Sequence, residues 1–254
     1  MLGTNRTLHI FYRHVHIKAD KLSRDPNKRR PAWFSHEVCF QNLLSTIRLD
    51  PLAARVKITI MYDGTVEDFT TDFVAKYYAN TAYGLTLQFI KGGTDMYSAM
   101  ITISSTKSSD LPADDLIYFL ENDYMHQYGW VSKLFELYNS GIKFDYVSLY
   151  DHRDKYHYEM YSNLTSKLVY SPSHHWRTAP STCGSFILEK RVLDRDYDIF
   201  SMWMTDYHLF SKLIGERGGI LLTPVPGLST HSMEGYLSPT IDWEKLAGEA
   251  ATGL

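Results

Sequence analysis

Hydrophobic and polar residues are grouped in blocks along the chain, and the blocks predict alternating strands and helices. Short apolar or alternating runs, typical of strands, cover residues 8–12, 56–62, 85–90 and 116–120. Stretches with helical spacing of apolar residues lie between them, at 35–47, 70–79 and 97–106. Ser35 is the predicted N-cap of the first helix. Alternating strands and helices are typical of a parallel sheet covered on both faces, so we predict an α/β fold.

The second half of the chain is less regular. Its pattern predicts helices at 128–139 and 204–215, and strands at 145–150, 181–188 and 220–224. The last residues, 248–254 (GEAATGL), are small and polar and are expected to form a frayed tail. No linker marks a second domain, so a single domain over residues 1–254 is predicted.

Polar or glycine-rich segments follow the predicted strands of the first half. They include Asp63-Gly64, Gly92-Gly93-Thr94 and Glu121-Asn122-Asp123. In open α/β sheets, ligands bind beyond the carboxyl ends of the strands. We therefore expect these segments to converge on one crevice.

The segment 116–123 is an apolar strand that ends in two carboxylates, Glu121 and Asp123. These two side chains would point the same way if the extended geometry continued past the strand. Mg²⁺ or Mn²⁺ commonly takes one or two carboxylates and completes its shell with substrate phosphates. The pair is therefore a candidate cation site, and an ordinary solvated turn explains the pattern equally well.

Asp206 and His231 are the other candidate residues for chemistry. Asp206 begins an amphipathic helix, where an acid stabilises the helix dipole or acts as a general base toward a hydroxyl. His231 follows the last predicted strand and becomes a candidate metal ligand only together with Asp123.

The order of these motifs resembles the GT-A glycosyltransferases, especially the inverting group called family 2. Glu121-Asn122-Asp123 is similar to the metal-binding DxD motif, and Asp206 to the catalytic base, with Thr205 in place of the usual Glu. His231 is similar in placement to the histidine that completes the metal site. The resemblance implies a GT-A sheet, mainly parallel and flanked by helices, with a nucleotide-binding N-terminal half and an acceptor-binding C-terminal half.

The same resemblance implies the ligands and the remaining site residues. The expected cofactor is Mn²⁺ or Mg²⁺, the donor a nucleotide sugar, a UDP-sugar first, and the acceptor a hydroxyl of a glycan or other molecule. Asp63 resembles the acid that reads the base or ribose, and Gly92, Gly93 and Thr94 fall where the family has a loop near the nucleotide. Glu121 and Asn122 are expected at the donor, and Arg177 is expected to add charge at the diphosphate.

Two further segments carry expectations of their own. Residues 156–177, rich in Tyr, Ser and His, are expected to fold over the donor as a lid. Residues 151–154 (Asp-His-Arg-Asp) either shape the acceptor site or a second metal contact, or form a salt-bridged structural loop.

The net charge bears on which partners the protein binds, and the cysteine content on which compartment it occupies. The net charge of −3 gives no general reason to expect nucleic-acid binding. A basic run at 24–30 (RDPNKRR), expected to be a solvated loop, is the main support for a hydroxylated DNA base as acceptor. The two cysteines are far apart and lack metal-site spacing, which favours a reducing, cytoplasmic location. No apolar run is long enough to span a membrane.

Two other functions remain open from the sequence. A sugar-nucleotide nucleotidyltransferase usually has a glycine-rich loop after the first strand, whereas this chain has Arg13-His14-Val15-His16 there. In a non-catalytic carbohydrate-binding protein the acidic motifs would be coincidental, and no metal-dependent turnover of a nucleotide sugar would occur.

Overall fold

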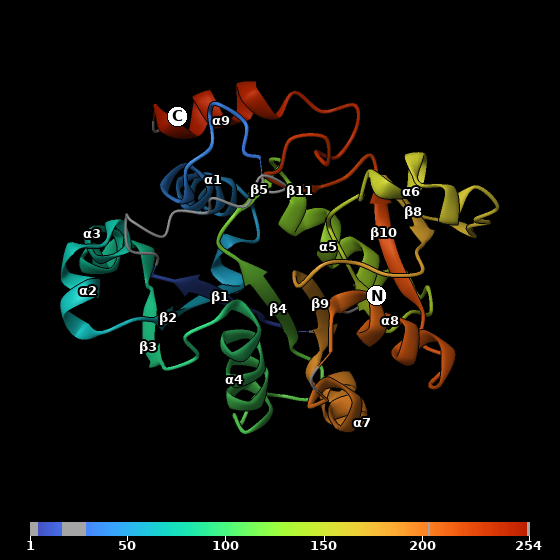
Figure 1. Ribbon diagram of the computed structural model, residues 1–254, viewed down its shortest axis with the longest axis horizontal. Helices are drawn as coiled ribbons and strands as arrows, with labels where there is room; N and C mark the ends of the chain where they lie inside the picture. Colours follow the sequence, from blue (N-terminus) through green and yellow to red (C-terminus); the bar gives the residue numbers. More distant parts are fainter. Residues whose placement is uncertain (1–4, 17–28, 203, 253–254) are drawn as a thin grey trace.

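The computed structural model describes residues 5–16, 29–202 and 204–252. Its strands and helices alternate through the first half of the chain as predicted (Figure 1). The strands are β1 (Leu8–Val15), β2 (Val56–Asp63), β3 (Thr86–Ile90), β4 (Leu116–Glu121), β5 (Tyr124–His126), β6 (Tyr146–Val147), β7 (Leu168–Ser171), β8 (His174–Thr178), β9 (Phe186–Glu189), β10 (Leu221–Val225) and β11 (Ser229–His231). The helices are α1 (His36–Arg48), α2 (Val66–Thr71), α3 (Phe73–Ala79), α4 (Asp95–Lys107), α5 (Trp130–Asn139), α6 (Asp154–His157), α7 (Lys190–Phe200), α8 (Asp206–Gly215) and α9 (Trp243–Ala251).

The main sheet runs in the order β3-β2-β1-β4-β9-β6-β10-β8-β7. Its first four strands are parallel, and so is the pair β6 and β10. Strand β9 lies antiparallel between β4 and β6, and the β7–β8 hairpin extends the far edge. The predicted α/β fold is therefore confirmed, as a mixed sheet whose parallel strands carry the predicted site.

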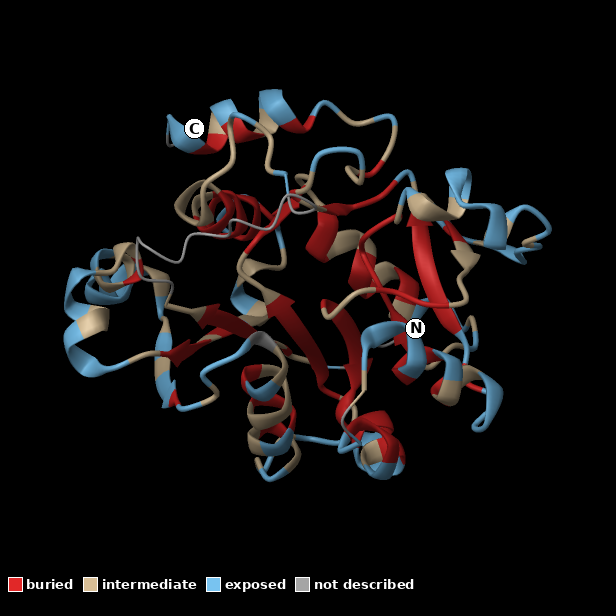
Figure 2. Cartoon of the chain, in the orientation of Figure 1, coloured by how far each residue is buried: buried red, intermediate tan, exposed pale blue. Residues whose placement is uncertain are grey.

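The two faces of the sheet bury two separate cores, because side chains alternate along each strand. On β1, Ile10 and Tyr12 pack in the core beneath α1, α3 and α5, whereas Phe11 packs in the core beneath α4, α7 and α8. Figure 2 shows the buried residues gathered on the central strands and on the helix sides that face them. The helices therefore form a layer on each face, and the carboxyl ends of the parallel strands stay at one edge.

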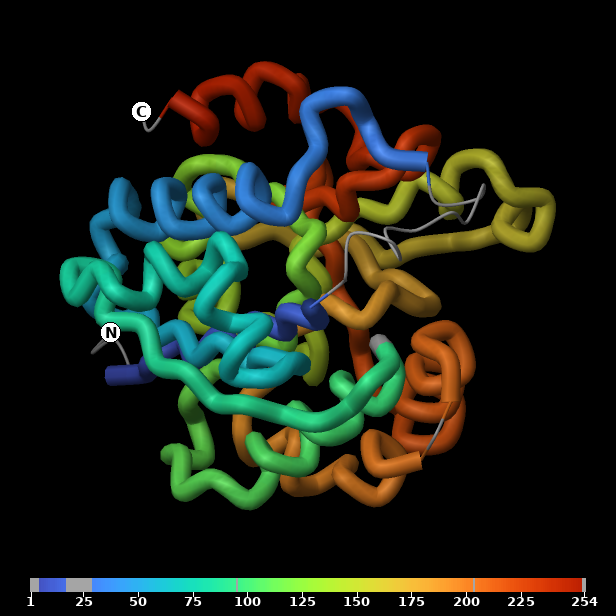
Figure 3. The backbone as a smooth tube through the Cα atoms, turned by 60° about the vertical axis from the view of Figure 1, so that its left-hand side comes forward, coloured from blue at the N-terminus to red at the C-terminus, as the bar shows by residue number. Residues whose placement is uncertain are grey.

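The C-terminal residues form a helix instead of the predicted frayed tail. Helix α9 lies along α1 (Figure 3), and its Trp243 and Ala247 pack with Cys39 and Met125. The Trp243 indole N–H donates to the carbonyl oxygen of Ser238 at 2.9 Å. A buried apolar cluster and a satisfied indole thus hold the segment in place, and the small residues in the second half of the helix concealed it in the sequence.

Other boundaries differ from the prediction for identifiable reasons. The helix predicted at 70–79 is two helices, because Asp72 leaves the helical conformation and caps α3 through Val74 N–H. The strand predicted at 145–150 is only two residues long, Tyr146–Val147. Helix α7 was not predicted, since its charged residues obscure the buried positions Val192, Leu193 and Ile199. Within the described ranges, every helix is too short or too polar to cross a lipid bilayer.

Candidate functional site

The chain turns sharply where β4 ends, and this turn separates the two predicted carboxylates. Residues 122 and 123 form the turn between β4 and β5. Glu121 therefore pairs with Arg13 of β1, with 2.6 Å between Oε1 and Nη2. Asp123 instead faces β11 and Arg30. The expected parallel orientation of the two side chains is wrong, because the extended geometry stops at Glu121.

Asp123 is held between two basic groups. Its Oδ2 accepts from His231 Nε2 at 2.8 Å and from Arg30 Nη2 at 2.7 Å. Burial favours a higher pKa for Asp123, but His231 and Arg30 outweigh it and lower the pKa. Burial likewise opposes the charge on His231, whereas Asp123 raises the net pKa of the imidazole. The predicted pair thus lies in direct contact, and the carboxylate stays ionised.

The Asp123 site has the chemistry of a partial cation site. Among the described residues, no group of three or more His, Cys, Asp or Glu side chains could hold a metal. However, Asp123 Oδ1 is buried without a hydrogen-bond partner, and His231 adds one nitrogen. A Mg²⁺ or Mn²⁺ ion that completes its shell with substrate phosphates fits this donor set.

Arg30 already supplies a positive charge at that carboxylate. It also donates from Nη1 to the carbonyl oxygen of Ser232 at 2.9 Å and lies over the Phe34 ring. In the basic run assigned to a solvated loop, residues 24–28 lie outside the described residues, but Arg30 forms an internal ion pair. Any cation that binds Asp123 must therefore share it with Arg30 or displace the guanidinium.

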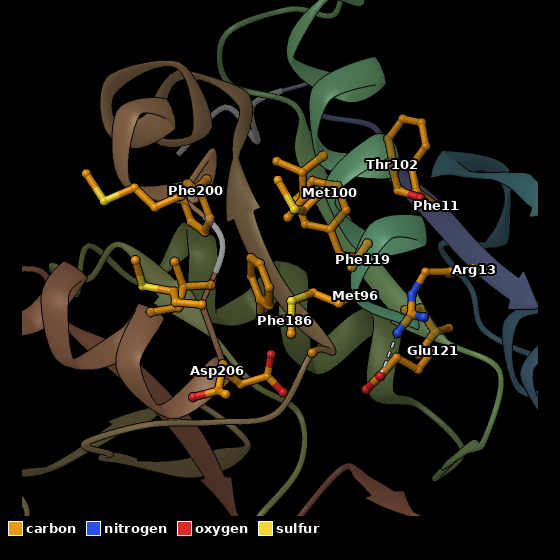
Figure 4. Close-up of a pocket in the computed structure, with 18 residues that line it drawn as sticks. Phe11, Arg13, Met96, Met100, Thr102, Phe119, Glu121, Phe186, Phe200 and Asp206 are labelled. Carbon is orange, nitrogen blue, oxygen red and sulfur yellow. Dashed lines mark hydrogen bonds and ion pairs between the residues drawn. The ribbon is translucent and has the colours of Figure 1, made fainter. Parts of the chain in front are cut away.

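On the other side of Glu121, a cavity of about 320 Å³ opens between the sheet and the helices α4, α7 and α8. Figure 4 shows Arg13, Glu121 and Asp206 at one end of this cavity, with phenylalanine and methionine side chains along the rest. Asp206 is the first residue of α8, as the sequence predicted for the acid at the start of a helix.

The Asp206 carboxyl has a strongly raised pKa, although the residue as a whole is exposed. Burial among the cavity walls raises the pKa to about 7, and the negative charge of Glu121 adds to the shift. Arg13, His231 and the backbone of Gly184 oppose it. A carboxyl that titrates near neutral pH beside a cavity is suited to proton transfer.

Small residues before β9 leave room for the Glu121 side chain. A Cβ atom added at Gly184 would lie 3.0 Å from the Glu121 carboxyl carbon. Ser185 Oγ accepts from the Glu121 backbone N–H at 3.0 Å. Next to them, burial raises the pKa of the Cys183 thiol, so this cysteine is a poor nucleophile. Gly184 and Phe186 of this segment line the cavity.

Asp63 organises the loop after β3. Its two carboxylate oxygens accept from the backbone N–H groups of Gly92 at 3.1 Å and Gly93 at 2.8 Å, and from the Ser98 hydroxyl. Gly92 has no space for a Cβ, which would lie 2.5 Å from the Ser98 nitrogen, and Gly93 has a φ of +72°. Thr94 caps α4. The structure therefore brings Asp63 and the glycine loop together, with the carboxylate turned into the loop.

A histidine network at the end of β1 was not recognised in the sequence. Asn122 Nδ2 donates to His14 Nδ1 at 3.0 Å, and His14 Nε2 donates to Asp72 at 3.0 Å. His16 and the Tyr62 hydroxyl reach the same Asp72 oxygen at 3.1 Å. These contacts join the ends of β1, β2 and β4. The alternating histidines of β1 were the available signal, but Asp72 is distant in sequence and could not be assigned to them.

Arg177 forms an ion pair with Asp151. Its Nη2 donates to Asp151 Oδ1 at 2.7 Å, and Tyr156 donates to the other oxygen of this fully buried carboxylate at 2.7 Å. Asp154 pairs with His152 at 2.7 Å and with Lys155 at 2.9 Å. The segment 151–154 therefore forms the salt-bridged loop that the sequence left open. The segment expected as a lid contains β7 and β8, which extend the main sheet.

Comparisons with known proteins identify the fold. No family model matches the chain, and neither does any curated protein. The solved structure of GalNAc-T7 with UDP, GalNAc and Mn²⁺ is similar, with a TM-score of 0.54, 11% identity and coverage of 97% of this chain. This chain spans 48%, about half, of that one. The galactosyltransferase LgtC, in complex with donor and acceptor sugar analogues, has a TM-score of 0.54 and 8% identity, with 96% of this chain and 95% of LgtC covered. The chain therefore has the GT-A fold that the order of its motifs predicted.

Proposed function

We propose that this protein is a glycosyltransferase that moves a sugar from a nucleotide-sugar donor to an acceptor hydroxyl. The observation that carries the proposal is the Asp206 carboxyl, with its pKa raised to about 7, at a cavity end that it shares with Glu121. Asp123, which pairs with His231, lies in the turn that directly follows Glu121. The GT-A fold and the UDP, sugar and Mn²⁺ named for GalNAc-T7 support this proposal.

Asp206 would act as the general base. Its ionised carboxylate would take the proton of the acceptor hydroxyl while the acceptor oxygen bonds to the anomeric carbon. The bond between that carbon and the diphosphate oxygen breaks, and the nucleoside diphosphate leaves with the electron pair. Attack from the side opposite the leaving group would invert the anomeric centre.

Asp123 and His231 would hold a divalent cation at the diphosphate. When bound, Mn²⁺ or Mg²⁺ neutralises the charge that develops on the leaving diphosphate. Asp123 would contribute Oδ1, the buried oxygen without a partner. Glu121 and Asn122 would border the donor, and the loop of Gly92, Gly93 and Thr94, held by Asp63, would lie on the nucleotide side.

Other parts of the chain have smaller roles in the proposal. The N-terminal half would bind the nucleotide and the C-terminal half the acceptor. Arg177 would add charge at the diphosphate only after leaving Asp151. The free cysteines Cys39 and Cys183 support a reducing, cytoplasmic location.

A thermal-shift panel tests the proposal directly. UDP, GDP, CDP, TDP and CMP would each be added with and without Mn²⁺, because a ligand that binds only the folded state raises its melting temperature. We expect a Mn²⁺-dependent shift with one nucleoside diphosphate, UDP first. The shift should be lost in Asp123→Asn and kept in the matched control Asp198→Asn, which alters an exposed ion pair. No shift with any nucleotide in either metal condition would refute the metal–diphosphate site.

A turnover assay separates the proposed transferase from its alternatives. The wild type would be incubated with UDP-glucose, UDP-galactose or UDP-N-acetylglucosamine and Mn²⁺, and the products would be separated. A glycosyltransferase releases UDP as it passes the sugar to an acceptor or, without one, to water, whereas a nucleotidyltransferase running in reverse with added pyrophosphate releases UTP and the sugar phosphate. A carbohydrate-binding protein releases neither.

A further inference from the structure

The cavity beside Asp206 has an apolar floor that the chemistry at its polar end does not explain. Phe11, Phe119 and Phe186 lie in register across the adjacent strands β1, β4 and β9. Their ring centroids are 6.2 Å apart between Phe11 and Phe119, and 5.3 Å apart between Phe119 and Phe186. These three rings form a continuous row across one face of the sheet, and Figure 4 shows them along the cavity.

The charged end of the cavity is the next row on the same face. Arg13 and Glu121 are register partners, each two residues beyond a phenylalanine of the floor. Two residues along a strand span about 7 Å, so the ion pair lies about that far from the rings. A ligand that places a hydroxyl between Glu121 and Asp206 would therefore extend its body over the phenylalanine row.

The opposite walls are apolar and adaptable. Helix α4 contributes Met96, Ala99 and Met100, and Leu209 closes the side of α8. The Thr102 hydroxyl, also at this wall, already donates to the carbonyl oxygen of Ser98 at 2.8 Å. Methionine side chains fit irregular apolar ligands, and these walls offer little to the hydroxyl groups of a sugar.

The size of the cavity sets the size of the apolar group. An engineered cavity of about 150 Å³ with apolar walls binds benzene. The cavity here is about 320 Å³, so it holds a body of roughly two aromatic rings or an alkyl chain of similar volume. The polar donor sugar and nucleotide would find few hydrogen-bond partners on the apolar walls, and buried hydroxyl groups need such partners.

We infer that the acceptor is an apolar alcohol, a hydroxyl group carried on an aryl or alkyl body that fills this cavity. The inference rests on the proposed transferase function and names the acceptor class for it. Asp206 meets the hydroxyl, the phenylalanine row stacks against the body, and the methionines of α4 cover it. Oligosaccharides and nucleic-acid bases would fit less well, because their hydrogen-bonding groups would find few partners along the phenylalanine row and the methionines.

Binding of simple alcohols to the wild-type protein tests the inference. 2-Naphthol represents the aryl arm, 1-decanol the alkyl arm, and maltose is the polar control, each titrated by calorimetry. We expect 2-naphthol or 1-decanol to bind and maltose not to bind. The tighter of the two alcohols identifies the body that the cavity prefers. Binding of maltose alone, or of none of the three, would overturn the inference.

Two substitutions test whether the alcohols bind in the cavity. Ala99→Leu fills it and should weaken alcohol binding at least tenfold, whereas Ala75→Leu, a half-buried alanine of α3 outside the cavity, should leave binding unchanged. Met100→Gln makes one wall polar at nearly constant volume and should also weaken binding about tenfold. Equal binding by the wild type and both cavity variants would overturn the inference.

The nucleotide panel separates this inference from the proposed function. A Mn²⁺-dependent UDP shift that persists in Ala99→Leu, without alcohol binding in the wild type, overturns the acceptor assignment and leaves the transferase standing. Alcohol binding with no shift for any nucleotide refutes the transferase, and with it the assignment of the bound alcohol as an acceptor. Release of UDP from UDP-glucose that 2-naphthol or 1-decanol accelerates supports both.

Discussion

Two carboxylates at one edge of the sheet, Asp206 and Asp123, have opposite surroundings. Asp206 lies at a cavity wall, where lost hydration and the nearby Glu121 raise its pKa to about 7. Asp123 is buried between Arg30 and His231, which lower its pKa despite the burial. Burial raises the pKa of both carboxyls; the contacts of Asp123 with His231 and Arg30 outweigh it, whereas the groups that oppose it at Asp206 do not.

The contrast assigns different chemistry to the two groups. A carboxyl that titrates near pH 7 can exchange a proton during turnover, whereas one held ionised between cations can only bind positive charge. The turn after Glu121 produces the separation, because it directs Glu121 toward the cavity and Asp123 toward β11. We therefore expect substitutions of the two aspartates to have different signatures.

The largest expected effect is the loss of turnover in Asp206→Asn. Removing the general base should lower the rate of UDP release from a UDP-sugar by roughly 10²- to 10⁴-fold. The Mn²⁺-dependent UDP shift should remain, because Asp206 does not contact the diphosphate in the proposed arrangement. Initial rates with Asp198→Asn as control measure the effect. A variant that keeps more than a tenth of the wild-type rate would remove Asp206 from the chemistry.

Asp123→Asn should instead destabilise the folded protein. It leaves the Arg30 guanidinium without its anion, and breaking a buried pair in this way costs about 3–5 kcal/mol. Urea unfolding at pH 8 measures the free energy of unfolding. Asp206→Asn should be neutral or stabilising in the same experiment, since it removes a poorly solvated charge. A similar loss of stability in both variants would show that the two aspartates do not differ in their contribution to the folded state.

The alternation of strands and helices was predictable from the sequence because it depends on local periodicity. The strand that ends at Glu121 and the helix that begins at Asp206 are both visible as apolar patterns. The charged helix α7 and the small-residue helix α9 were missed because tertiary packing, on the sheet and on α1, stabilises them. Local pattern therefore identified the elements that carry the site and missed several that support it.

The candidate residues were predictable as types, but their partners were not. Asp123 and His231 were named together, whereas Arg30 belonged to a run that looked solvated. The row of Phe11, Phe119 and Phe186 depends on strand order and register across three distant segments. Such contacts are set by topology, and a single sequence gives no direct measure of them.

Arg30→Gln tests whether Arg30 competes with a cation for Asp123. The substitution removes a cation that competes for the carboxylate, so Mn²⁺ should bind more tightly. The gain should be roughly tenfold, equivalent to one hydrogen bond to a charged group of about 1.5 kcal/mol. Electron paramagnetic resonance of free Mn²⁺ in a titration measures it, with Arg217→Gln, at an exposed ion pair, as control. Unchanged or weaker Mn²⁺ binding would show that Arg30 does not compete with the cation.

The pH dependence of stability that comes from Asp206 gives a further test of the contrast. Its pKa in the folded state, about 7, lies above the ordinary value of about 3.9, so the folded state holds the proton more tightly than the unfolded state. This contribution to stability is fully present below pH ~3.9 and is lost as the pH rises to about 7.

The melting temperatures of the wild type and Asp206→Asn, compared at intervals from pH 5 to 8, measure this effect. The asparagine side chain of the variant does not titrate. The melting temperature of the variant should therefore rise relative to that of the wild type up to about pH 7, and the difference should stay constant above it. Asp123 contributes nothing to this difference, because its lowered pKa keeps it ionised throughout the range in both proteins. A difference that stays flat from pH 5 to 8 would mean that Asp206 is already ionised at pH 5, as an ordinary surface carboxylate would be.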